Sequence, residues 1–161
     1  MNKISKAISA IFVTLLFLTT ACKANISRND DGSFTVETTI SQQELQEVIT
    51  ASIADPLIQE LTASLQSGYV LVTGTRQRLN DASKTDTLSF RLDLGVSNGQ
   101  LTSSITNAQI DGTAIEQNRV DLWNQTIANR LAILGQKNEK STLQTVSITP
   151  DHVSMVWNVV R

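Results

Sequence analysis

The sequence predicts an α+β domain in which a curved antiparallel sheet packs around or against one long helix, at about residues 114–134, and a shorter one at about 42–54. Three observations lead to this fold class. Apolar and polar residues alternate in several segments, which is typical of half-buried strands. The apolar residues of both helical stretches fall on one face of a helix, and in the longer stretch they recur at intervals of three to five. Asn98-Gly99 joins two alternating segments, and this dipeptide is a strong hairpin signal.

The first 21 residues predict a secretory signal peptide. Lys3 and Lys6 give a basic start, an apolar run follows from Ala7 to Leu18, and small residues close the segment. A transmembrane helix that stays in place is the alternative interpretation. The apolar run is shorter than the roughly 18–20 residues that a bilayer requires, so the signal peptide is favoured.

Cys22 is the only cysteine of the chain, and it follows this segment directly. The residues Thr19-Thr20-Ala21-Cys22 resemble the lipobox of bacterial lipoproteins, although Thr19 stands where leucine is usual. The resemblance implies that Cys22 is acylated and becomes the first residue of the mature protein, with the membrane as its partner. Ordinary cleavage that discards Cys22 is the alternative. We expect residues 22–33 to form a flexible tether and 34–161 to form a single domain.

The resemblance places the protein in the cell envelope, facing the periplasm or the exterior. Lys23 follows the cysteine where an aspartate would indicate retention in the inner membrane, and this slightly favours the outer membrane if the cell has one. Loss of residues 1–21 leaves 11 basic residues against 15 acidic ones. This balance argues against a nucleic-acid partner and against adsorption through a polybasic patch.

The domain begins with an alternating strand over 34–40. Ser41 and Glu44 form the pattern of a capping box at the start of the first helix, and Pro56 should end that helix. Residues 57–66 fit a helical turn that passes into a strand, which we favour, or a strand throughout.

Strands should follow over 69–78, 88–96 and 100–110, with a loop at 80–84. Gly74 indicates a bulge or a close backbone approach. The apolar face slips by one residue late in the third strand, which predicts a bulge near Asn107.

The long helix should end with Gly135 at the C′ position. Two more strands are expected after it. Val146 and Ile148 belong to the first, and the second places Val153, Met155, Trp157 and Val159 on one face.

Catalytic patterns are scarce. His152 is the only histidine and lies beside Pro150-Asp151, so an exposed turn residue is favoured over a general base. Asp55, Asp93 and Asp111 are interpreted as turn formers or solvated positions. The sequence has no G-x-S-x-G elbow and no phosphate-binding glycine loop before a helix. We therefore expect a non-enzymatic protein without a metal or a cofactor.

The order of five segments resembles a known group of proteins. These segments are ISQQELQEVI, SGYVLVTGT, LSFRLDLGVSNGQLTSSITNAQIDGTAI, VDLWNQTIANRL and VSITPDHVSMVWNVV. Together they resemble bacterial envelope lipoproteins of the tubular lipid-binding (TULIP-like) kind, including the LmeA-like phospholipid-binding family. The resemblance implies a long helix wrapped by a curved sheet, with an apolar groove for acyl chains. Such families carry no invariant chemical residues, so no site residue is transferred.

A lipid or another apolar ligand is therefore the first functional hypothesis. Its candidate binding face consists of apolar residues from the long helix and from the strands opposite: Val120, Trp123, Ile127, Leu131, Leu88, Phe90, Leu92, Met155 and Trp157. The alternative is that these residues form a plain core. The protein would then be an envelope scaffold or interaction lipoprotein with a solid core and no ligand cavity.

Overall fold

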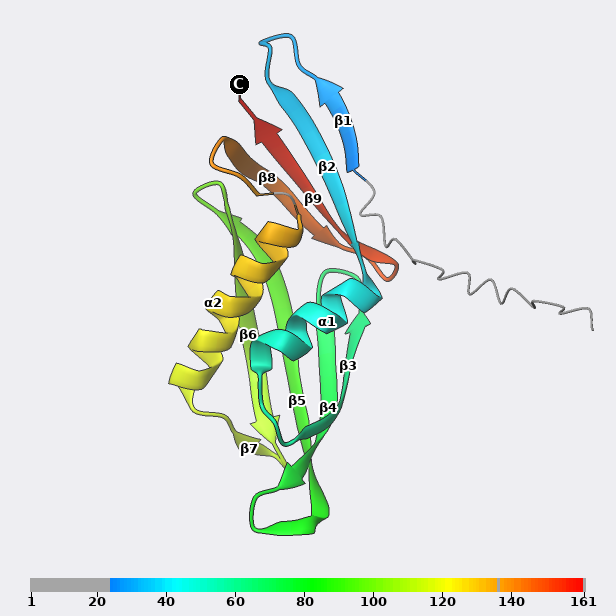
Figure 1. Cartoon of the computed structure of the whole chain (residues 1–161), viewed down its shortest axis with the longest axis vertical. Coiled ribbons are helices and arrows are strands. Elements are labelled where there is room, and N and C mark those ends of the chain that lie inside the picture. The colour runs from blue at the N-terminus through cyan, green and yellow to red at the C-terminus, as the bar shows by residue number, and fades with distance from the viewer. Residues whose placement is uncertain (1–23, 136, 161) are drawn as a thin grey trace, which may run out of the picture.

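The computed structural model describes residues 24–135 and 137–160, which form two antiparallel sheets and two helices (Figure 1). The predicted α+β class is confirmed. The strands belong to two sheets, whereas the sequence predicted one curved sheet. Sheet A has the strand order β1 (Ala24–Arg28), β2 (Phe34–Ser41), β9 (His152–Val159) and β8 (Ser141–Ile148). Sheet B follows the chain: β3 (Ile58–Leu65), β4 (Val70–Arg78), β5 (Asp81–Ser97), β6 (Gln100–Ile110) and β7 (Thr113–Ala114).

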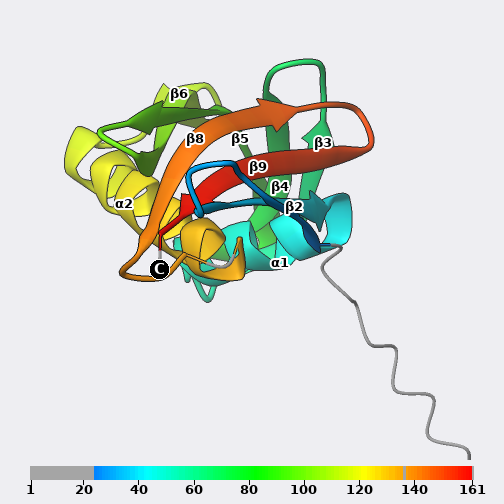
Figure 2. The same cartoon turned by 90° about the horizontal axis from the view of Figure 1, so that it is seen from above.

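The two helices, α1 (Gln42–Ile53) and α2 (Gln117–Leu134), pack against each other and against the sheets. α1 contacts β2 and β3, and α2 lies along β6. Seen from above, the strands of sheet A curve across the end of the molecule, next to both helices (Figure 2). One hydrophobic core joins the buried faces of both helices to both sheets.

The predicted capping box is confirmed at the start of α1. The Ser41 side chain accepts a hydrogen bond from the Glu44 amide (3.3 Å), and the Ser41 amide donates to Glu44 Oε2 (2.8 Å). The helix ends at Ile53, and Ala54 has the left-handed φ of 47°. Pro56 therefore follows the end of the helix, as predicted.

Two local predictions are wrong. Residues 57–66 contain no helical turn, because residues 58–65 form β3, which pairs with β4 and buries Leu61, Ala63 and Leu65 in the core at every second position. The predicted loop at 80–84 is mostly strand, since β5 begins at Asp81 after the turn Leu79-Asn80. This end of the β4–β5 ribbon is largely exposed. Its residues are therefore mostly polar and do not show the alternation of apolar and polar residues that indicates a half-buried strand.

The hairpin and the bulge are confirmed. Asn98 and Gly99 have φ values of 51° and 72°, as a two-residue turn with two left-handed positions requires. The register of β5 and β6 shifts between Ser89 and Arg91, opposite Asn107, which has a φ of 56°. The hairpin also links the sheets, because the Leu143 amide of β8 donates to the Gly99 carbonyl (2.8 Å).

α2 begins three residues later than predicted, because residues 113 and 114 form β7 and pair with the end of β6. Gly135 follows the helix, but its φ of −75° is not the left-handed value expected at C′. A Cβ atom at this position would lie 2.7 Å from Met155 Sδ. The glycine is therefore explained by the close approach of the helix end to β9.

The predicted tether is also corrected. Residues 24–28 form β1 and pair with β2 from Ala24↔Thr38 to Arg28↔Phe34, so this part of the predicted tether belongs to the folded domain. The predicted signal peptide and Cys22 lie outside the described residues. Within the described part of the chain, no helix is long and apolar enough to cross a membrane.

Gly74 provides a test of the packing between β3 and β4. A Cβ atom on Gly74 would lie 2.6 Å from the Glu60 carbonyl oxygen, at the irregular register of β3. Gly74→Ala should lower the free energy of unfolding by about 1–3 kcal/mol, because backbone must move to admit the methyl group. Urea denaturation followed by tryptophan fluorescence measures this value.

Gly95→Ala is the matched control in the same sheet. Its methyl group would meet only the Thr102 hydroxyl, at 3.2 Å, and a side chain can turn away. We expect a change of less than about 0.5 kcal/mol. Equal effects of the two substitutions would contradict the close approach at Gly74.

Candidate functional site

The nine residues of the predicted ligand face lie together in the hydrophobic core. Each is between 0% and 4% exposed, and all belong to one cluster of buried side chains. The rings of Phe90 and Trp123 lie 6.0 Å apart between their centroids. The sequence thus placed these residues on the inward faces of their elements, where they pack against one another.

Trp157 also lines an apolar pocket of about 250 Å³ beside the first strand. Its other lining residues are Ala24, Ile26, Val36, Val159 and Asn138. The indole Nε1 of Trp157 is buried without a hydrogen-bond partner. We call this hollow the β1 pocket.

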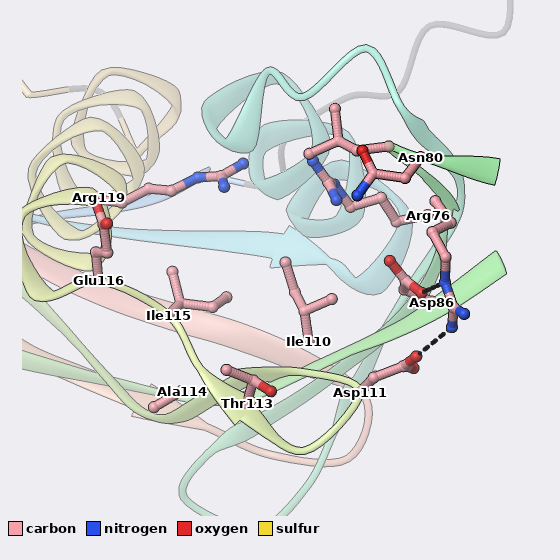
Figure 3. Close-up of a pocket in the computed structure, with 12 residues that line it drawn as sticks. Arg76, Asn80, Asp86, Ile110, Asp111, Thr113, Ala114, Ile115, Glu116 and Arg119 are labelled. Carbon is pink, nitrogen blue, oxygen red and sulfur yellow. Dashed lines mark hydrogen bonds and ion pairs between the residues drawn. The ribbon is translucent and has the colours of Figure 1, made fainter. Parts of the chain in front are cut away.

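A larger pocket, of about 530 Å³, lies where the ends of β4 and β6 meet β7 and the first turn of α2 (Figure 3). We call it the arginine pocket. Its wall contains three arginines, three acidic residues and several apolar side chains: Arg76, Arg78, Arg119, Asp86, Asp111, Glu116, Leu79, Ile110, Ala114 and Ile115, with Asn80 and Thr113.

Asp55, which does not itself line the pocket, forms ion pairs with two of these arginines. Its side chain is only 6% exposed, and Oδ2 accepts hydrogen bonds from Arg76 Nε and from Arg119 Nη2, both at 2.8 Å. Oδ1 accepts from the Leu57 amide at 2.9 Å. Burial on its own would raise the pKa of Asp55. The hydrogen bonds from Leu57, Arg76 and Arg119 outweigh burial and hold the pKa below its ordinary value, so the carboxylate is charged.

Arg76 has donors that no described residue uses. Its side chain is 10% exposed, and the interactions of the described residues engage only Nε, at Asp55. The terminal nitrogens Nη1 and Nη2 therefore face the pocket that Arg76 lines. Figure 3 shows the side chains of Arg76 and Arg119 pointing toward one another, above Ile110 and Ile115.

At the other end of the pocket, Arg78 is shared by two carboxylates. Its Nε donates to Asp86 at 2.6 Å, and Nη2 donates to Asp111 at 2.9 Å. The Thr87 amide donates to Asp111 at 2.7 Å and is the main cause that lowers the pKa of that carboxyl. Because the donors of Arg78 are engaged in this way, its charge is neutralised within the protein.

The sequence did not predict this pocket. Asp55 and Asp111 were expected to be turn or solvated residues, whereas Asp55 is nearly buried between two guanidinium groups. A signal was present in β4, since Val70, Val72, Gly74 and Arg76 occupy every second position. Arg76 therefore lies on the inward face, where a charged group requires a partner.

His152 begins β9 and is half-buried. Its amide donates to the Thr149 hydroxyl at 3.2 Å, and its carbonyl accepts from the same hydroxyl at 3.0 Å, so its backbone closes the turn. Among the residues that the structure describes, no group of three histidine, cysteine or acidic side chains is placed to hold a metal ion.

Comparisons of the chain with protein-family models, with curated proteins and with solved structures found no match.

The ion pairs of Asp55 yield a stability prediction. Asp55→Asn leaves Arg76 nearly buried without its counter-charge, and the free energy of unfolding at pH 7 should fall by about 3 kcal/mol. The folded-state pKa of Asp55 is lowered, so its stabilising effect is present above an ordinary pKa of about 3.9 and is lost as the pH falls through the lowered value. Urea denaturation between pH 7 and pH 2 should show the two proteins converging in acid.

Asp93→Asn is the control, because its pair with Arg91 is partly exposed on both sides and should contribute much less to stability than the buried pairs of Asp55. A difference between Asp55→Asn and wild type that is equally large at pH 2 and pH 7 would contradict the charged pairing.

Proposed function

We propose that this chain is a membrane-anchored lipoprotein of a bacterial cell envelope, which acts by binding and not by catalysis. The anchor rests on the signal-peptide pattern of residues 1–21 and on the lipobox-like residues before Cys22. The protein then faces the periplasm or the exterior, with the outer membrane slightly favoured where one exists. The role without catalysis rests on the sequence, in which no catalytic motif accompanies the single histidine His152.

The burial of the predicted ligand face decides between two modes of binding, on the outer surface or in an apolar cavity. All nine apolar residues are at most 4% exposed and contribute to one core cluster. A domain of this size depends on such a core, because it has no disulfide to supplement it. The observation favours an interaction or scaffold lipoprotein that meets its partner on its outer surface.

Binding of a lipid or another apolar ligand is the second candidate, and the β1 pocket favours it. That pocket is mostly apolar, and Trp157 brings one member of the predicted face to it. The resemblance to tubular lipid-binding proteins, with one curved sheet wrapped around the long helix, belongs to this candidate. One feature of that arrangement is present, since the long helix α2 lies along strand β6.

The anchor is tested by Cys22→Ser. We expect wild type in the membrane fraction and the variant out of it or unprocessed, because two or three acyl chains contribute about 0.8 kcal/mol for each buried CH₂ group. Cell fractionation with immunoblotting measures both. Identical fractionation and maturation of the two proteins would refute the anchor.

The binding mode is tested by native mass spectrometry of the full chain, released from detergent. We expect the mass of the chain with its covalent anchor and no further lipid. A bound lipid that Ile26→Asp removes and Leu79→Asp retains would establish the second candidate instead. Both side chains are similarly exposed, at 69% and 73%, and only Ile26 lines the β1 pocket.

A further inference from the structure

We propose that the arginine pocket binds a singly charged carboxylate that carries an apolar group, with the carboxylate on Arg76 and Arg119. The inference is independent of the membrane anchor and of the occupant of the β1 pocket. The chemical class of the ligand is derived from the side chains that line the arginine pocket.

The unused donors of Arg76 are the first argument. Nε of this nearly buried guanidinium is held by Asp55 at 2.8 Å, while Nη1 and Nη2 face the pocket without a partner among the described residues. These two nitrogens are open to water in the pocket, since Trp157 Nε1 is the fully buried, unpaired polar side-chain atom among the described residues, and a charged acceptor would bind the guanidinium more strongly than water. The two terminal nitrogens of a guanidinium form a planar pair that matches the two oxygens of a carboxylate.

Arg119 supplies the second guanidinium from the first turn of α2. Asp55 holds its Nη2 at 2.8 Å, and its Cζ lies 5.1 Å from the centre of the Trp123 ring. Two contacts thus fix a side chain that is still 38% exposed. The amino-terminal end of α2 adds partial positive charge at the same wall.

The charges of the pocket favour a ligand with one negative charge over a ligand with two. Asp55 neutralises one of the two guanidinium groups, Glu116 lines the same pocket, and Arg78 is already shared by Asp86 and Asp111. With Asp55 included, four carboxylates stand against three arginines, so a doubly charged phosphate would be repelled more strongly than a singly charged group. A ligand with one negative charge can place that charge on Arg76 and Arg119, away from Asp86 and Asp111.

The apolar part of the ligand has its own surface. Ile110 and Ile115 lie below the two arginines, and Leu79 and Ala114 line the same hollow (Figure 3). The volume of about 530 Å³ lies within the range of small-molecule sites. A carboxylate next to a branched aliphatic group therefore fits both the charge and the wall.

Equilibrium dialysis of radiolabelled N-acetyl-leucine against the detergent-solubilised full chain, with a detergent-only blank, tests the proposal. N-acetyl-leucinamide is the matched probe, because it differs only in lacking the charged carboxylate. We expect saturable binding of the acid, with a dissociation constant at least about tenfold lower than that of the amide. Inorganic phosphate should not displace the acid at equal concentration.

Two variants locate the site. Arg119→Gln should weaken acid binding about tenfold, and Asp55 keeps Arg76 as its partner, so the fold is retained. Arg91→Gln removes a cation that pairs with Asp93 outside the pocket and should leave binding unchanged. Circular dichroism confirms that both variants are folded. Equal affinity for acid and amide, no saturable binding, or wild-type affinity in Arg119→Gln would overturn the proposal.

Discussion

The pairing of Asp55 with two arginines is the constraint on which the arrangement of the helices depends. Asp55 follows α1, Arg76 lies near the end of β4, and Arg119 belongs to the first turn of α2. One carboxylate thus joins three elements that are distant in the sequence. A buried ion pair adds little stability over an apolar contact of the same shape, but an incomplete one is costly. A packing that separates α2 from β4 would lose the pair between Arg119 and Asp55, so the pairing favours this placement of α2.

The sheets are subject to a second constraint, which acts through backbone contacts. β8 pairs with β9 in sheet A, yet its Leu143 amide donates to Gly99 at the hairpin of sheet B. The carbonyl of Ile148, at the other end of β8, accepts from the Gly68 amide. β8 is therefore held at both ends by sheet B. Side chains at Gly99 and Gly135 would collide with Thr142 and Met155, so glycine is required where sheet A approaches its neighbours.

The features that the sequence predicted correctly are local ones. The capping box at Ser41, the Asn98-Gly99 turn and the bulge near Asn107 each depend on a few neighbouring residues, and all three are present. The failures have a common physical cause, since they concern polar segments whose structure comes from a distant strand. β1 is formed by pairing with β2, and the exposed start of β5 by pairing with β4. Their composition alone does not distinguish such strands from loops.

The candidate site shows the same limit for function. Alternation along β5 and β9 correctly placed Leu88, Phe90 and Met155 on inward faces, but periodicity reports only the direction of a side chain. Whether the inward side chains leave a hollow depends on how elements from the whole chain fit together. Arg76 illustrates the converse: its position in the alternation of β4 marks a charged group on a buried face, which must be paired or used. Because the predicted apolar face is part of the core, the buried charge of Arg76 is the better starting point for the search for a ligand.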